Sequence, residues 1–334
     1  MLMLFSLIFL LSSLSVYPNS NNLPPLANKF SSTAKYPLIK DVVHPDKPLF
    51  FEIAKRLKAG KFEKIFRRGM LFYGPPGVGK DEMIKAIVNE SECLIFTRDG
   101  SQLVNGLQGS GAQAIASIFN KARKVDPSKG IVVLIDELQG VTPVTSDKNI
   151  KPAFKNDGLE HENSLTQLWL EFDKCSKEEH ANIMIIATCN QFDRIDKRIR
   201  DRFMCIEFSN PDDKDAYEIL KNKAHYYNVP LTEAELKKYV KDMKGLSGRD
   251  LTTFIQDTGV NISKGLSKEK ALESAAKRRS NNNNKAKKEQ SKKSLLDRIE
   301  QPVRIIANVS EIARNGQSIH NNYRKYKRTV QHFL

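Results

Sequence analysis

The sequence has few cysteines and no motif that pairs them. Its 334 residues contain four cysteines, and no two of these are separated by only two residues. Scattered thiols of this kind indicate a reducing compartment and argue against a disulfide framework or a cysteine zinc site. The histidines form no HExxH motif either, because His161-Glu162 lacks the second histidine. This absence excludes a zinc metalloprotease site of the HExxH type.

Charged side chains are absent from residues 1–17, which are mostly Leu, Phe, Ile, Val and Met. As a helix this run is about 25 Å long, slightly short of the ~30 Å hydrocarbon core of a bilayer. Three interpretations compete, and the first two carry equal weight. One is an uncleaved anchor that holds the following domain in the cytoplasm, because the first lysines come after the run. The other is a cleaved signal peptide, although a basic n-region is missing. The third interpretation is a wrongly assigned start codon or a nonfunctional apolar end.

Basic charge is concentrated at the other end of the chain. The formal net charge is +15, and the residues from Ala276 to Leu334 contain 15 Lys and Arg against 4 Asp and Glu. Most of the excess positive charge therefore belongs to this tail. A tail of this sign favours contact with nucleic acid or anionic lipid, and a merely solvated tail is an equally good interpretation.

A glycine-rich turn is the most informative stretch of the chain. Residues 70–73 predict a strand and residues 82–88 predict a helix, and between them lies Gly74-Pro75-Pro76-Gly77-Val78-Gly79-Lys80. Glycines let successive backbone N–H groups point at a phosphate, and the start of the helix adds its positive dipole end. Lys80 then reaches the outer phosphates. The spacing is that of a P-loop except at its last position, where Asp81 replaces the Mg²⁺-binding Ser or Thr.

Two further strands end in polar side chains. Residues 131–135 are all apolar and predict a central parallel strand, and Asp136 and Glu137 follow it directly. We expect Asp136 to hold Mg²⁺ through water and Glu137 to polarise the attacking water. Residues 183–190 predict another buried strand, whose last residue is Asn190. We expect Asn190 to orient the attacking water, and the alternative is a simple turn residue.

Arginines are concentrated just before the strand predicted over residues 205–208. Arg200 and Arg202 lie in the stretch Asp196-Lys197-Arg198-Ile199-Arg200-Asp201-Arg202-Phe203. An arginine supplied by a neighbouring subunit would stabilise the charge of a phosphoryl-transfer transition state. An exposed basic helix end is the alternative interpretation.

Strands and helices alternate along the first part of the chain and then give way to helices alone. This order predicts an α/β fold in which helices sandwich a parallel P-loop sheet, followed by a small all-helical lid. Residues 140–163 predict a loop, and residues 164–174 predict a helix that places Trp169 in the core. The expected divisions are an anchor or signal (1–17), a linker (18–36), the nucleotide-binding domain (37–210), the lid (211–276), a basic low-complexity linker (277–294) and a basic helical tail (295–334).

In this order the segments resemble the AAA family of the AAA+ ATPases over roughly residues 39–276. The resemblance implies ATP and Mg²⁺ as ligands, with the motif from Gly74 to Asp81 around the phosphates and Asp136 and Asp81 at the metal. It implies that Asn190 is sensor 1 and that Arg200 and Arg202 are arginine fingers. It also implies that the segment from Gly248 through Arg249 to Asp250 borders the adenine, with Arg249 as a sensor 2 arginine.

The resemblance further implies a hexameric ring of identical subunits that uses ATP hydrolysis to remodel or unfold a macromolecule, chiefly protein. Leu107-Gln108-Gly109 stands where the family has its pore loop, with Leu107 and Gln108 in place of the usual aromatic pair. Two alternatives remain. Asp81 favours a weakly active or inactive nucleotide-binding scaffold, and the basic tail favours a motor that acts on nucleic acid.

Overall fold

The computed structural model of the chain describes residues 37–63, 66–103, 110–141, 157–175 and 180–279, the backbone of Ala27–Asn28, and residue 292. The predicted anchor, the Leu107-Gln108-Gly109 segment and the basic tail beyond residue 292 lie outside these residues. Among the helices that fall within the described ranges, none combines the length and the apolar character that crossing a bilayer requires.

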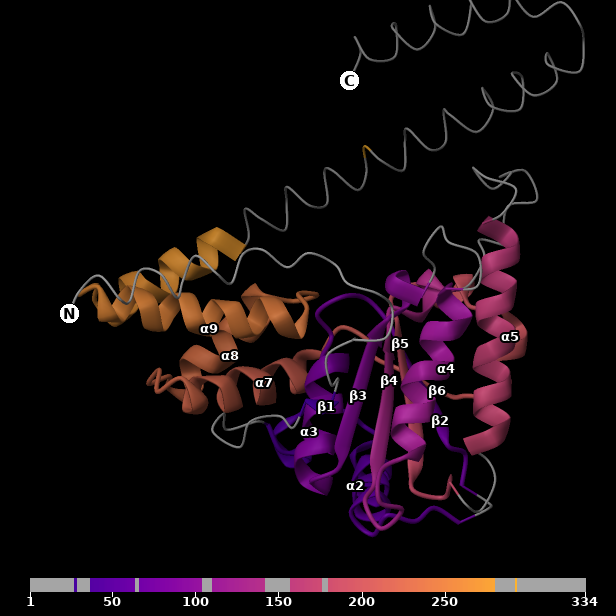
Figure 1. Cartoon of the computed structure of the whole chain (residues 1–334). Coiled ribbons are helices and arrows are strands. Elements are labelled where there is room, and N and C mark those ends of the chain that lie inside the picture. The colour runs from indigo at the N-terminus through magenta and orange to yellow at the C-terminus, as the bar shows by residue number, and fades with distance from the viewer. Residues whose placement is uncertain are drawn as a thin grey trace, which may run out of the picture. The chain divides into compact units, whose positions relative to one another are not determined.

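A six-stranded sheet lies at the centre of the α/β part, with the strand order β1-β3-β4-β5-β2-β6 (Figure 1). The five strands from β3 to β6 in that order are parallel, and the two-residue β1 pairs antiparallel with β3. The strands are β1 (Ala27–Asn28), β2 (Gly69–Tyr73), β3 (Leu94–Asp99), β4 (Ile131–Asp136), β5 (Ile183–Cys189) and β6 (Met204–Glu207).

The central strands are apolar along their whole length because both faces of the sheet are covered. On β4, Val133 packs into one hydrophobic cluster while its neighbour Val132 packs into the other. On β5, Ile185 and Ile186 divide in the same way. Alternate residues of a strand point to opposite faces, so an unbroken apolar run is what a sheet buried on two sides requires.

Two pairs of helices cover these two faces (Figure 1). Residues of α4 (Ser110–Arg123) and α5 (Asp157–Cys175) enter the first cluster, and those of α2 (Lys47–Lys58) and α3 (Lys80–Ser91) enter the second. The short α6 (Lys197–Arg200) joins the first cluster through Ile199. Helices on both faces of a parallel sheet define an α/β sandwich.

The chain divides into two compact units. The first is Met1–Asn222 with Ser247–Arg249, and the second is Lys223–Leu246 with Asp250–Leu334. The described part of the second unit is helical. Its helices are the end of α7 (Asp213–Tyr226), α8 (Glu233–Asp242), most of α9 (Gly248–Ser263) and residues 268–279.

The start of α8 shows how the sequence fixes a helix boundary in the second unit. Thr232 accepts a hydrogen bond from the backbone N–H of Glu235, and the Glu235 carboxylate accepts one from the backbone N–H of Thr232 at 2.7 Å. This reciprocal pair is a capping box, which satisfies two N–H groups that have no partner within the helix. The Thr232-to-Glu235 pattern predicted it.

The predicted fold class is confirmed, and two details of the prediction are wrong. The predicted loop over 140–163 is too long, because α5 begins at Asp157 and residues 157–163 are helical. Trp169 is half-buried and packs at the edge of the first cluster instead of inside it. The predicted domain borders stay predictions.

Candidate active site

The P-loop links the end of β2 to the start of α3, and its conformation depends on glycine. Gly74 has a φ of 141°, and a Cβ on it would lie 1.8 Å from the backbone oxygen of Phe208. Neither the backbone angle nor this close approach tolerates a side chain. Tyr73 is the last residue of β2, so the chain leaves the sheet directly into the turn that the sequence predicted.

Lys80 is the first residue of α3 and is almost wholly buried, with 7% of its surface exposed. Its ammonium donates to the carbonyl oxygens of Gly74 at 2.6 Å and Pro75 at 2.8 Å, and to the side-chain oxygen of Asn190 at 2.8 Å. An ammonium has three donors, and these contacts use all of them. Burial lowers the pKa of Lys80, and the charge of Asp81 acts in the opposite direction. The loop therefore holds a cation in place beside the expected phosphate position.

Asp136 and Glu137 stand at the carboxyl end of β4, as predicted. The hydroxyl of Thr188, on the adjacent β5, donates to the Asp136 carboxylate in a short hydrogen bond. The backbone N–H of Glu137 donates to the Thr188 hydroxyl oxygen at 3.0 Å and to Asp136 Oδ1 at 3.1 Å. Glu137 has a left-handed backbone, with a φ of 51°. Thr188 therefore positions Asp136 and constrains the turn that carries Glu137.

No motif in the sequence had indicated a role for Thr188. The available signal was a hydroxyl residue near the end of an otherwise apolar strand, two residues before Asn190. A buried hydroxyl needs a hydrogen-bond partner. A parallel neighbour strand that ends in a carboxylate supplies one here.

Asn190 connects the cation to the carboxylate. Besides accepting from Lys80, its side-chain nitrogen donates to Glu137 Oε1 at 3.4 Å. The structure thus brings together Lys80, Asn190, Glu137 and Asp136 from three elements: α3, β4 and β5. Carboxyl ends of parallel strands meet at one edge of a sheet, which is where ligands bind in such folds.

The two predicted arginine fingers have different surroundings. The guanidinium of Arg200 lies 5.0 Å from the centre of the Phe192 ring, and its Nε is buried without a hydrogen-bond partner among the described residues. Arg202 is exposed, and its guanidinium lies 5.6 Å from the centre of the Trp169 ring. Arg200 is therefore packed against Phe192 of the same chain, whereas Arg202 is open to solvent.

The segment Ser247–Arg249 belongs to the first unit and lies against the P-loop. The backbone N–H of Arg249 donates to the carbonyl oxygen of Gly77 at 2.9 Å. A Cβ on Gly248 would lie 3.4 Å from that same oxygen. Gly248 and Arg249 thus lie beside the P-loop. Their roles stay predictions.

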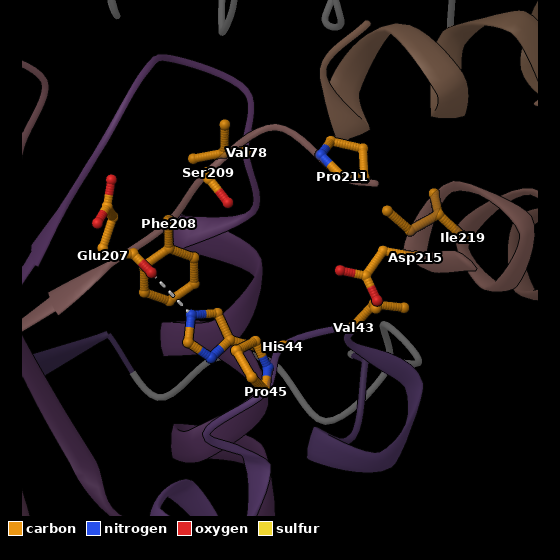
Figure 2. Close-up of a pocket in the computed structure, with 10 residues that line it drawn as sticks. All are labelled: Val43, His44, Pro45, Val78, Glu207, Phe208, Ser209, Pro211, Asp215 and Ile219. Carbon is orange, nitrogen blue, oxygen red and sulfur yellow. Dashed lines mark hydrogen bonds between the residues drawn. The ribbon is translucent and has the colours of Figure 1, made fainter. Parts of the chain in front are cut away.

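A pocket adjoins the P-loop at Val78 (Figure 2). Asp215 and Val43 lie across this pocket from Val78 and Ser209 (Figure 2). Burial raises the pKa of Asp215. The lining residues are Val43, His44, Pro45, Val78, Glu207, Phe208, Ser209, Pro211, Asp215 and Ile219. Its walls combine apolar side chains with the polar side chains of His44, Glu207, Ser209 and Asp215. No motif in the sequence had indicated this lining.

The donor groups at the site fit a magnesium ion bound together with phosphates. Within the described residues no group of three or more His, Cys, Asp or Glu side chains is placed to hold a metal alone. Mg²⁺ usually takes one or two carboxylates and completes its shell with water and substrate phosphates. Asp136 supplies one such carboxylate. Asp81, exposed in the first turn of α3, supplies a second candidate.

Comparison with known proteins assigns this domain. Strand order, P-loop and the carboxylates of β4 define a P-loop NTPase. Residues 70–210 match the model of the family described as "ATPase family associated with various cellular activities (AAA)". Residues 70–210 therefore form an AAA-family P-loop ATPase domain.

Several curated proteins align with a longer part of the chain. Protein SAP1 of Saccharomyces cerevisiae is 27% identical over 251 residues, which cover 72% of this chain and 27% of the relative. ATP-dependent zinc metalloprotease FtsH 2 of Thermoanaerobacter sp. is 31% identical over 228 residues, which cover 65% of this chain and 42% of the relative. Human spastin is 27% identical over 213 residues, which cover 63% of this chain and 32% of the relative. The chain thus spans less than half the length of each of these relatives.

Proposed function

We propose that this chain binds ATP with Mg²⁺ and couples ATP hydrolysis to the remodelling or unfolding of a macromolecule, most directly a protein. The observation that carries the proposal is the side chain of Asn190, which contacts both Lys80 and Glu137. Hydrolysis requires a group that holds the phosphates close to a group that activates water, and this amide contacts the candidate for each role.

Each residue has a defined part in the proposed reaction. Lys80 leaves the carbonyl oxygens of the P-loop and donates to phosphate oxygens of ATP. Glu137 accepts a proton from the attacking water as the oxygen of that water bonds to the γ-phosphorus and the bond to the β-phosphate breaks. Asn190 orients Glu137 and the water. Mg²⁺, held by Asp136 and Asp81, would neutralise charge on the phosphate oxygens.

We also propose a ring of identical subunits, as AAA ATPases generally form, with six as the expected number. In such a ring Arg200 and Arg202 are candidates to reach the ATP of the next subunit and stabilise the developing charge. Because Arg202 is exposed, it is a stronger candidate for this role than Arg200. The name of FtsH 2 includes ATP dependence, which agrees with the proposal. It also includes zinc proteolysis, which we do not extend to this sequence because it contains no HExxH motif.

Phosphate release by the purified full chain tests the central proposal. We expect Glu137→Gln to bind ATP and to release phosphate at least about a hundredfold more slowly, because the proton acceptor is lost. Glu269→Gln, an exposed change in the helical unit, is the matched control and should leave the rate unchanged. Equal phosphate release from Glu137→Gln and the unmodified chain would end the claim of hydrolysis.

A second candidate function rests on Asp81. A carboxylate at this position adds negative charge beside the triphosphate, which favours a scaffold that binds nucleotide and assembles without rapid turnover. Retention of Glu137, Asn190 and Arg202 in one chain supports the active enzyme over the scaffold.

We further propose that residues 1–17 anchor the protein in a membrane with the ATPase domain in the cytoplasm. The support is the charge-free apolar run, followed by lysines. Recovery of the intact N-terminus in the membrane fraction is the expected result. Recovery of a shortened, exported protein would contradict it in favour of a signal peptide.

A further inference from the structure

Trp169 is the one tryptophan of the chain. It lies on α5 at the edge of the first hydrophobic cluster and is only half-buried. Its indole nitrogen is buried and has no hydrogen-bond partner among the described residues. Packing alone therefore does not account for an indole here, because its polar atom gains nothing from burial.

Two guanidinium groups contact the ring of Trp169. That of Arg198 lies 4.7 Å from the ring centre and that of Arg202 lies 5.6 Å from it. Both distances are within the ~6 Å at which a cation is attracted to an aromatic face, and tryptophan is the strongest ring for this contact. The indole thus contacts two arginines that come from a segment some thirty positions further along the chain.

Arg202 is also held from a second direction. One terminal nitrogen of its guanidinium donates to the backbone oxygen of Arg198 at 3.2 Å. Arg198 in turn is fixed by Asp196, with nitrogen-to-oxygen distances of 3.1 Å and 3.0 Å. The exposed arginine is therefore ordered by a chain of contacts from Asp196 through Arg198, together with the indole.

Arg200, two residues earlier, belongs to a different set of contacts. It packs on Phe192, and the Phe192 ring stacks on Tyr73 with centres 4.1 Å apart and planes 26° apart. Tyr73 directly precedes the P-loop. Arg200 is thus built into its own subunit, and the indole serves the arginine that faces solvent.

We propose that Trp169 is a positioning residue for Arg202, holding its guanidinium ready to act on ATP bound by a second copy of this chain. The inference rests on the proposed function. An arginine loses rotamer freedom when it engages a phosphate, and a side chain that is already ordered loses less. Misplacement of a catalytic group by about 1 Å can cost up to a hundredfold in rate. Trp169 therefore acts on kcat through Arg202 and makes no contact with the nucleotide of its own subunit.

The contact itself is tested by tryptophan fluorescence, without any measurement of hydrolysis. Arg202→Ala uncovers part of the ring, so acrylamide should quench Trp169 emission more strongly than in the unmodified chain. Arg194→Ala, an exposed arginine in the same region, is the control and should leave quenching unchanged. If Arg202→Ala leaves quenching unchanged, the contact does not exist and the inference falls, whether or not the protein hydrolyses ATP.

Kinetics then test the positioning role. We expect Trp169→Leu to lower kcat between about fivefold and a hundredfold with little change in KM for ATP. Trp169→Phe, which keeps an aromatic face, should recover part of the loss. Equal losses in both variants would show that only packing volume matters and would overturn the inference.

Mixed rings separate action on the neighbour from damage within the subunit. Trp169→Leu subunits keep an intact site but present a poorly held Arg202, whereas Glu137→Gln subunits have an inactive site and an intact Arg202. Mixing the two should therefore release more phosphate than the sum of the separate preparations. Absence of this gain would overturn the inference. Absence of hydrolysis by the unmodified chain would instead contradict the proposed function. The contact between Trp169 and Arg202 that fluorescence measures would not be affected by that result.

Discussion

The side-chain oxygen of Asn190 accepts a hydrogen bond of 2.8 Å from the ammonium of Lys80. The two residues come from the end of β5 and the start of α3, and the adjacency of β5 and β2 in the sheet brings them together. The amide nitrogen of Asn190 faces Glu137. In the proposed reaction Lys80 moves to a phosphate, so Asn190 would lose one partner and keep the other. We therefore expect nucleotide binding to be linked to the position of the Glu137 carboxylate.

Replacing Asn190 tests this link. We expect Asn190→Ala to lower kcat for phosphate release by about a hundredfold, the typical effect of removing one aligned polar group from a transition state. ATP affinity should change little, because Lys80 and the P-loop remain. Phosphate release and equilibrium ATP binding measure the two effects separately. Gln191→Ala, an exposed neighbour, serves as the control. Weaker ATP binding with an unchanged kcat would contradict the link.

Arg200 and Arg202 should respond differently to the same change. Arg202 is exposed, so Arg202→Ala should lower kcat markedly and leave the melting temperature nearly unchanged. Arg200 packs on Phe192 with a buried Nε, so Arg200→Ala should lower the free energy of unfolding by about 1–2 kcal/mol through lost packing. Thermal unfolding and phosphate release of both variants decide this. A stable, inactive Arg200→Ala protein would reverse the assignment.

The sequence predicted those parts of the site that are local in the chain. The P-loop and the Asp136-Glu137 pair are each contiguous, so their residue types and spacing define them directly. Two features depend on residues that only the fold brings together. Thr188 matters because β5 lies beside β4, and the contacts of Trp169 with Arg198 and Arg202 join two segments that are far apart in the chain. Helical spacing identifies the face on which Trp169 lies, but it does not identify what that face contacts.

The beginning of α5 was missed for a related reason. Residues 157–163 are largely polar and include a glycine, so they carry no apolar periodicity from which a helix could be inferred. Their acidic residues stand in the first turns of the helix, where negative charge is favoured by the helix dipole. Helical structure there reflects the packing of the rest of α5 on the sheet more than local propensity.

Changes at Asp81 should separate charge from metal binding. We expect Asp81→Thr and Asp81→Asn to bind metal-free ATP about fivefold more tightly, because an exposed charge near the triphosphate contributes roughly 1 kcal/mol in water. Asp81→Thr should need more Mg²⁺ for half-maximal rate, because an anionic ligand is lost. Titrations with and without Mg²⁺ measure both. A gain in rate well above tenfold for Asp81→Thr would instead support the scaffold function.

His44 should make stability depend on pH. The backbone N–H of Asp46 donates to its Nδ1, so its Nε2 carries the proton and donates to the carbonyl oxygen of Glu207 at 3.1 Å. The ring packs against Phe208, with centres 4.3 Å apart, and its side chain is 6% exposed. Burial lowers the pKa of His44, while the nearby charges of Asp46 and Asp215 oppose the effect of burial.

A lowered histidine pKa means that the unfolded chain binds more protons than the folded one in the window below the ordinary value of about 6.5. The free energy of unfolding should therefore fall as pH drops from about 6.5 towards the lowered pKa, with a slope of at most ~1.4 kcal/mol per pH unit. Urea unfolding between about pH 5 and pH 8 measures this slope. His44→Asn should flatten it, and His225→Asn, at an exposed site, should not. Because the raised pKa of Asp215 gives an opposite slope at lower pH, the informative quantity is the difference between variant and unmodified protein at each pH. A difference that stays constant from about pH 5 to pH 8 would show that His44 does not contribute to the pH dependence of stability.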